Sequence, residues 1–224
     1  MKNILITGCS WVQKMYKYNT NYDYEYASFG GRGLWYIQDY LQSRKLNNYD
    51  GIVIQLPTPI RNIIQSNDTT ERFHNFIEQI KTLGEEPAAT ELLNEYKQTI
   101  IEINKLHDNI VFFLYNVGGY PLRHPYNFSD DADNNMLNFL KSNNLKHLYL
   151  SYEGESGYGL AEEECLDEEF WEYYHENNPF NGNSTLKHYW NIIAPKNVII
   201  KDPHPNETAD RAALNLIDKY FKTV

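Results

Sequence analysis

Two distant segments of the chain carry side chains that could together form a serine nucleophile activated by a base. Ser10 follows Gly8 and Cys9 at the end of an apolar run, where a tight turn would present its hydroxyl. A serine alkoxide is inaccessible at neutral pH, so this hydroxyl needs a base within hydrogen-bond distance. His204 lies just before a C-terminal helical stretch and two residues after Asp202, whose carboxylate could orient the imidazole and stabilise its protonated form. The residue types therefore indicate a nucleophile, a base and an orienting carboxylate.

A third segment, residues 30–33, could supply hydrogen-bond donors to an oxyanion. It reads Gly-Gly-Arg-Gly, and glycine lets the backbone approach a ligand closely and offer its N–H groups. No Lys followed by Ser or Thr ends this segment, so it is not a Walker phosphate loop. Each of the three segments alone is typical of an ordinary turn or helix cap, and only their combination favours catalysis.

The elements that must position these residues are short apolar runs alternating with helical stretches. The patterns predict strands at 2–7, 24–29, 51–56, 109–117, 146–152 and 197–200, and helices at 34–41, 71–83, 90–106, 133–140 and 205–221, with a break at 84–87. Such alternation predicts parallel β-α-β units, and the continuous apolar character of the strands predicts helices on both faces of the sheet.

We therefore predict an α/β fold, a three-layer α/β/α domain with a flavodoxin-like, mainly parallel sheet of about five strands. The domain is expected to span residues 1–224, with helical insertions near 66–106 and 151–190. Ligands of such sheets bind outside the carboxyl ends of the strands. Ser10 and His204 are accordingly expected to meet over one edge of the sheet.

The order of these segments resembles that of the SGNH hydrolases, also called the GDSL esterase/lipase family. Their first block is a Gly-Asp-Ser-like motif directly after the first strand, and residues 8–11 read Gly-Cys-Ser-Trp, with Cys9 at the usual Asp position. Their second block supplies a glycine N–H, and residues 28–33 (Ser-Phe-Gly-Gly-Arg-Gly) are similar to it. Their fifth block carries Asp and His followed by Pro, as in residues 202–206 (Asp-Pro-His-Pro-Asn).

This resemblance implies a serine esterase. Ser10 would be the nucleophile, His204 the general base and Asp202 its orienter, while the N–H groups of Ser10 and Gly31 would belong to the oxyanion hole. The reaction would be acyl transfer to water through an acyl-serine intermediate, without a cofactor. Small O-acyl esters are the implied substrates, above all O-acetyl groups on carbohydrates.

The chain departs from the family pattern at the third block, which is a strand followed by Gly-x-Asn-Asp. The Asn of that block is the third oxyanion donor, and residues 52–62 contain no Gly-x-Asn. Losing one such donor typically costs about 100- to 1,000-fold in rate, so a replacement is expected. Gln55, Thr58, Arg61 and Asn62 are the candidates for this donor. Asn62 is placed in the oxyanion hole, and the expected substrate contacts are Arg61, Thr58, Gln55 and Trp11.

The fifth block also departs from the pattern. Many family members place Asp three residues before His, where this chain has Lys201, and Asp202 stands two residues before His204.

Two other functions are possible on the same scaffold. One is an O-acyltransferase that uses the same triad with a sugar hydroxyl in place of water. The other is a non-catalytic carbohydrate-binding or assembly protein that has lost the third oxyanion donor.

Composition excludes several other classes. The 224 residues carry a net charge of −10, which argues against a nucleic-acid or anionic-membrane surface. Two cysteines imply no disulfide framework, and no His-x-x-x-His or Cys-x-x-Cys spacing indicates a metal site. No apolar run approaches the ~20 residues of a membrane span and no signal peptide is evident, so a cytoplasmic protein is expected. The sequence does not identify the oligomeric state.

Overall fold

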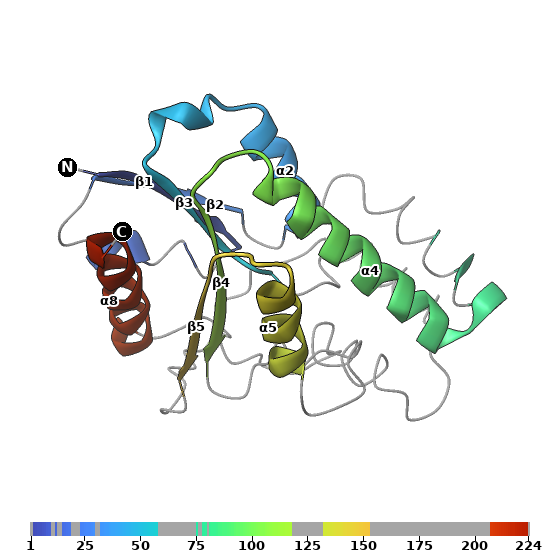
Figure 1. Cartoon of the computed structure of the whole chain (residues 1–224). Coiled ribbons are helices and arrows are strands. Elements are labelled where there is room, and N and C mark those ends of the chain that lie inside the picture. Colours follow the sequence, from blue (N-terminus) through green and yellow to red (C-terminus); the bar gives the residue numbers. More distant parts are fainter. Residues whose placement is uncertain are drawn as a thin grey trace, which may run out of the picture.

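A parallel β-sheet covered by helices on both faces forms the body of the molecule (Figure 1). The computed structural model describes residues 2–9, 12, 15–18, 23–29, 32–57, 75, 78–79, 81–117, 132–152 and 207–223. Within these residues the arrangement of the elements confirms the predicted three-layer α/β/α architecture.

Five strands make the sheet, and every neighbouring pair is parallel. They are β1 (Asn3–Gly8), β2 (Asp23–Ser28), β3 (Gly51–Gln55), β4 (Ile110–Val117) and β5 (His147–Tyr152). Their order is β2-β1-β3-β4-β5, which is the flavodoxin-like order with its switch point between β1 and β3. The predicted strand at 197–200 lies outside the described residues.

In the central strands β1 and β3 the apolar residues follow one another without alternation, because both faces of these strands are buried. Successive side chains of a strand point to opposite faces. In β1 the side chain of Leu5 belongs to one core cluster, whereas Ile4 and Ile6 belong to the other. In β3 Ile52 and Val53 divide in the same way. Helices on both faces of the sheet thus explain why these two central strands show no alternation of polar residues, whereas the edge strand β2 (Asp-Tyr-Glu-Tyr-Ala-Ser) does alternate.

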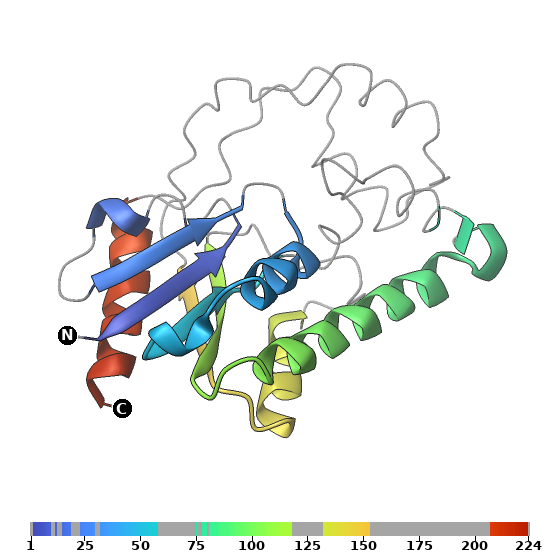
Figure 2. The same cartoon turned by 90° about the horizontal axis from the view of Figure 1, so that it is seen from above.

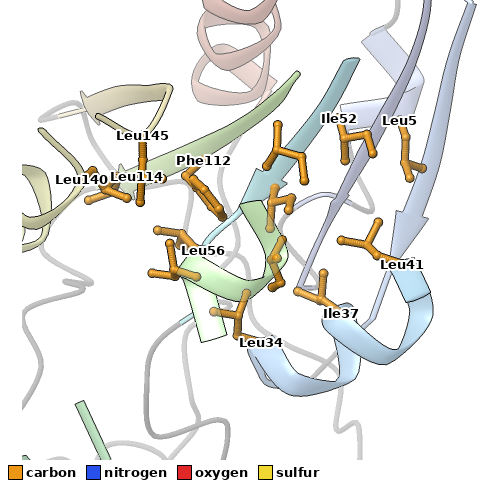
Figure 3. Close-up of a cluster of buried hydrophobic side chains, with 14 of the residues drawn as sticks. Leu5, Leu34, Ile37, Leu41, Ile52, Leu56, Phe112, Leu114, Leu140 and Leu145 are labelled. Atoms are coloured by element: carbon orange, nitrogen blue, oxygen red, sulfur yellow. The ribbon is translucent and has the colours of Figure 1, made fainter. Parts of the chain in front are cut away.

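One face is covered by α2 (Leu34–Gln42), α4 (Glu85–Asn104) and α5 (Ala132–Ser142) (Figure 1). Their apolar sides and the strands form the larger core cluster, whose labelled members converge between the sheet and the helices (Figure 3). The indole N–H of Trp35 in α2 donates to Thr99 Oγ1 in α4 at 2.9 Å and joins the two helices. A short 3-10 turn, η2 (Leu46–Asn48), leads from α2 into β3.

The opposite face is covered by α8 (Glu207–Thr223) and the 3-10 turn η1 (Tyr16–Tyr18), so α8 lies across the sheet from α2 and α4 (Figure 2). Phe221, near the end of α8, packs against Gly51 at the start of β3. Lys2 Nζ, beside the start of β1, donates to Phe221 O at 2.6 Å. The helix therefore ends at the amino edge of the sheet. Its 17 residues span roughly 25 Å, which carries its first turn toward the carboxyl edge.

The structure corrects the predicted start of the helix expected at 90–106. The sequence placed a break at 84–87 and a helix from residue 90, but α4 begins at Glu85. Pro87 lies in its first turn, where a missing N–H breaks no intrahelical hydrogen bond. Gly84, with φ of 90°, adopts the left-handed backbone that ends the preceding segment.

The structure describes a larger part of the first predicted insertion than of the second. The one at 66–106 includes α4, whose Tyr96, Ile100 and Ile103 are buried in the larger core cluster. Its earlier helix, expected at 71–83, is described only at residues 75, 78–79 and 81–83, all of them helical. Of the insertion at 151–190, only residues 151 and 152 are among the described residues. The extent of both insertions stays a prediction.

Candidate active site

The carboxyl ends of three adjacent strands meet at the position where the sequence predicts an active site. Gly8 at the end of β1 pairs with Ser28 at the end of β2. On the other side of β1, Thr7 pairs with Ile54, which places Gln55 beside Gly8. Because the strands are parallel, the segments that follow residues 8, 28 and 55 all leave the sheet at the same edge. These segments contain the predicted nucleophile, the glycine donor and the candidates for the third donor.

Three hydrogen bonds hold the backbone of Cys9, the residue directly before Ser10. Gln55 Oε1 accepts from Cys9 N at 3.0 Å. Ser28 Oγ donates to Cys9 O at 3.0 Å. Val12 N also donates to Cys9 O at 3.0 Å. We call these three bonds the Cys9 clamp. It ties the end of β1 to the ends of β2 and β3 and to the turn that follows.

The exit of β2 is tied to β1 by two further bonds. Phe29 N donates to Gly8 O at 2.9 Å, which extends the parallel ladder one residue beyond the strand. Thr7 Oγ1 is buried and donates to Ala27 O at 2.9 Å. The chain therefore enters the glycine segment from a fixed position against β1.

The exit of β3 is fixed from the larger core. Leu56 N donates to Phe113 O of β4 at 3.0 Å, and the buried phenol of Tyr96 in α4 donates to Pro57 O at 2.5 Å. Burial, and secondarily the neighbouring Cys9 thiol when ionised, raises the pKa of Tyr96 well above its ordinary value. Tyr96 is therefore a neutral hydrogen-bond donor throughout the physiological pH range.

Gly8 is required by the crowding around the clamp. A Cβ at this position would lie 2.7 Å from Gln55 Cβ and 2.8 Å from Val12 Cγ2. Carbon atoms do not approach that closely, so any larger residue would displace Gln55 or the turn at Val12. The glycine of the first motif thus has a steric reason in this chain.

The amino end of α8 approaches the same edge of the sheet. Ala209 and Ala213 belong to the core cluster that contains Cys9, Val12 and Met15. The guanidinium of Arg211 lies 4.7 Å from the ring centre of Tyr18 in η1. His204 precedes the first residue of α8, Glu207, by three positions. The described part of α8 is thus compatible with a base near Ser10.

Of the predicted site residues, only Gln55 is among the described residues. It is 3% exposed, its Oε1 accepts from Cys9 N, and its Nε2 donates to Leu56 O at 2.8 Å. Both ends of the amide are therefore engaged with main chain, and its contact with substrate stays a prediction. The predicted residues outside the described part of the chain are Ser10, Trp11, Gly31, Thr58, Arg61, Asn62, Asp202 and His204.

Sequence reasoning missed two contributors to this edge. Ser28 belongs to the segment that resembles the second block, but no sequence signal indicates that its hydroxyl donates to Cys9 O. Tyr96 was counted only as part of a helix, and no sequence signal marks its bond to Pro57, 39 residues away. Within the residues that the structure describes, no group of three His, Cys, Asp or Glu side chains could hold a metal ion. No described helix is long and apolar enough to cross a membrane.

No protein-family model matches the chain, and no curated protein matches it in sequence. Solved structures do match. An inferred acylhydrolase from Bacteroides fragilis aligns with a TM-score of 0.50 at 12% identity, over 99% of this chain and 87% of its own. A GDSL-like lipase from Bacteroides thetaiotaomicron gives 0.48 at 12% identity over 99% and 88%. An acetyl xylan esterase gives 0.47 at 14% identity over 97% and 98%.

Identities this low establish the fold alone, and only the first of these alignments reaches a TM-score of 0.50. The chain has an SGNH-hydrolase-like fold in a divergent form. This fold agrees with the family that the sequence motifs resemble. The structural neighbours carry the names of esterases, lipases and acylhydrolases.

Proposed function

We propose that this protein is a serine esterase that hydrolyses small O-acyl esters through an acyl-serine intermediate. The observation that carries the proposal is the Cys9 clamp, which fixes the main chain immediately before Ser10 at the junction of three strand ends. Ligands of this sheet type bind at that edge. A nucleophile there must be held in place, because catalysis depends on a fixed geometry between the reacting groups.

In the proposed reaction Ser10 Oγ attacks the ester carbonyl while His204 accepts the hydroxyl proton. Asp202 holds the imidazole in the required orientation and stabilises its protonated form. The N–H groups of Ser10 and Gly31 donate to the oxyanion that develops on the carbonyl oxygen. His204 then protonates the departing alcohol, and water releases the acyl group by the reverse sequence.

The third oxyanion donor is assigned to Asn62, with Arg61, Thr58 and Trp11 proposed as substrate contacts. Arg61 suits a substrate that carries an anionic group, because its guanidinium binds carboxylates in a bidentate manner. Carbohydrate O-acetyl groups are the substrate class that the sequence resemblance favours.

The test is hydrolysis of p-nitrophenyl acetate together with labelling by a fluorophosphonate probe. Wild-type protein is expected to hydrolyse the ester and to carry the probe on Ser10, as located by peptide mass spectrometry. Ser10→Ala is expected to lose both, and His204→Ala is expected to lose most of the rate. Equal hydrolysis by wild type and Ser10→Ala would refute the assignment of the nucleophile.

Two outcomes would favour the other functions. Transfer of the acetyl group to an added sugar, in preference to water, would identify an O-acyltransferase with the same triad. A folded protein that neither hydrolyses the ester nor reacts with the probe would indicate a non-catalytic carbohydrate-binding protein. The absence of Gly-x-Asn after β3 is the observation that keeps this last possibility in the test.

A further inference from the structure

We propose that Gln55 is a positioning residue that sets the direction of the nucleophile segment by holding the backbone of Cys9. Its amide bridges the ends of β1 and β3, since it accepts from Cys9 N at 3.0 Å and donates to Leu56 O at 2.8 Å. The role rests on the proposed esterase function, but it assigns Gln55 neither to the substrate nor to the oxyanion.

The chemistry of the bridge requires a carboxamide. Cys9 presents an N–H, which needs an acceptor, and Leu56 presents a carbonyl, which needs a donor. A side-chain amide offers both on one planar group, so the orientation of Gln55 follows from its two partners. A carboxylate would place an oxygen against the carbonyl of Leu56. An apolar side chain would leave two buried main-chain groups without a partner, which is costly.

The clamp controls more than the position of Cys9. Gln55 fixes the peptide group between Gly8 and Cys9, because it holds the N–H of that group. Ser28 and Val12 fix the next peptide group, because they hold its carbonyl oxygen, Cys9 O. A trans peptide is planar, with its N–H opposite its carbonyl. Holding Cys9 O therefore also sets the direction of the N–H that follows it, which is the proposed oxyanion donor of Ser10.

Packing leaves the bridge little freedom. Gln55 is 3% exposed, and a methyl group placed on Gly8 would lie 2.8 Å from Gln55 Oε1. The amide thus lies directly against the backbone of the first motif. A buried side chain that is held at both ends and confined by its neighbours has one available geometry, as a positioning role requires.

Two substitutions of Gln55 test the proposal with p-nitrophenyl acetate. Gln55→Met keeps the length of the side chain and removes both hydrogen bonds. It is expected to lower kcat about 100-fold with KM little changed, the size of effect expected when reacting groups are misplaced. Gln55→Glu is expected to restore both bonds only when its carboxyl is protonated, since the acid then accepts from Cys9 N and donates to Leu56 O.

The pH dependence separates positioning from simple destabilisation. Burial raises the pKa of a carboxyl, so the ratio of kcat for Gln55→Glu to kcat for wild type should rise as the pH falls from about 8 to about 5. The same ratio for Gln55→Met should stay flat, because methionine does not titrate. Thr99→Val, which removes the bond between α2 and α4, is the matched control. It should lower the stability while keeping kcat.

A measurement without substrate makes the result independent of the proposed function. Amide exchange by NMR should find the N–H of Cys9 protected in wild type and rapidly exchanging in Gln55→Met, while the N–H of Leu5 and Ile54 stays protected in both. Unchanged exchange at Cys9 would overturn the bridge. An active protein in which Gln55→Met keeps the wild-type kcat would overturn the positioning role. A wild type without esterase activity or probe labelling would refute the esterase alone, and the exchange result would still decide the bridge.

Discussion

The phenol of Tyr96, at the centre of α4, donates a hydrogen bond to the carbonyl oxygen of Pro57 at 2.5 Å. Both residues are buried, and 39 positions separate them in the sequence. The bond fixes the point at which the chain leaves β3 for the segment that carries Thr58, Arg61 and Asn62. A residue of the helical layer thus controls the start of a predicted substrate segment.

Tyr96→Phe is expected to lower the free energy of unfolding by about 1–3 kcal/mol at pH 7, because the carbonyl of Pro57 loses its donor. This loss in the free energy of unfolding should become smaller at alkaline pH. Unfolded tyrosine loses its proton at about pH 10, whereas burial raises the pKa of Tyr96 in the folded protein. The folded state then binds more protons than the unfolded state, so the stabilisation by Tyr96 is complete below about pH 10 and declines above it.

Urea unfolding of wild type and Tyr96→Phe at pH 7, 9 and 10.5 measures this difference. Tyr16→Phe is a suitable control, because Tyr16 is 55% exposed and removal of its hydroxyl should leave the free energy of unfolding unchanged. A difference between wild type and Tyr96→Phe that grew with pH would contradict the assigned direction of the pKa shift.

Most of the fold was predictable because its signals are local. β1 and β3 are predicted from short apolar runs that end at glycine or proline. The observed β1 is shifted by one residue from its predicted range, and the observed β3 ends one residue earlier. α8 was predicted from its apolar stripe, which faces the sheet as expected. The start of α4 was missed because Pro87 was interpreted as a breaker, although proline is tolerated in a first helical turn.

The hydrogen bonds of the candidate site were not predictable in the same way. Gln55 was selected because it ends a strand beside a predicted active site, which is a local signal. Its partner Cys9 depends on the register between β1 and β3, and a single sequence does not contain that register. The hydroxyl of Ser28 was overlooked for the same reason, because its partner lies 19 residues away on a neighbouring strand.

Gly8→Ala and Gly51→Ala form a matched pair at opposite ends of the sheet. In both, the new methyl group meets a fixed side chain: Gln55 at Gly8 and Phe221 at Gly51. Overpacking of this kind costs about 1–3 kcal/mol of stability in each protein. Gly8→Ala displaces the Cys9 clamp itself, whereas Gly51→Ala acts only on the far end of α8 through Phe221, so Gly8→Ala should lower kcat for p-nitrophenyl acetate much more. The measurement is kcat per folded molecule, with the folded fraction taken from circular dichroism.

One result for these two variants would contradict the role of the Cys9 clamp. If Gly51→Ala lowered kcat as much as Gly8→Ala, the loss would reflect general destabilisation, and the clamp would have no special part in catalysis. Gly51 is suited to this comparison because it lies at the amino edge of the sheet, at the opposite end of the strands from Ser10.

The thiol of Cys9 is expected to be unreactive in the folded protein. The residue is 3% exposed and belongs to the core cluster under α8. Thiol reagents attack the accessible thiolate, so burial should slow the reaction. In a Cys165→Ser background, Ellman's reagent should modify Cys9 within minutes in urea and much more slowly in buffer. Equal rates in the two solutions would show that Cys9 is accessible and would make it a second candidate nucleophile beside Ser10.

Phe221 anchors the end of α8 that lies farthest from the candidate site. Its ring is 1% exposed and packs against Gly51, while its carbonyl accepts from Lys2 Nζ at 2.6 Å. Phe221→Ala should lower the free energy of unfolding by about 3–5 kcal/mol, the cost of a cavity left by a large buried ring. Lys2→Met removes only a favourable cation from the helix end and should cost about 0.3–1 kcal/mol.

Thermal and urea unfolding of these two variants therefore separates packing from the helix-end charge. The comparison bears on the site because α8 begins three residues after His204, and the helix can hold that segment only if it stays docked on the sheet. Phe221→Ala should accordingly lower kcat for p-nitrophenyl acetate at temperatures well below its unfolding midpoint, whereas Lys2→Met should not. If Phe221→Ala lost stability but kept the full kcat, the position of the base would not depend on the docking of α8.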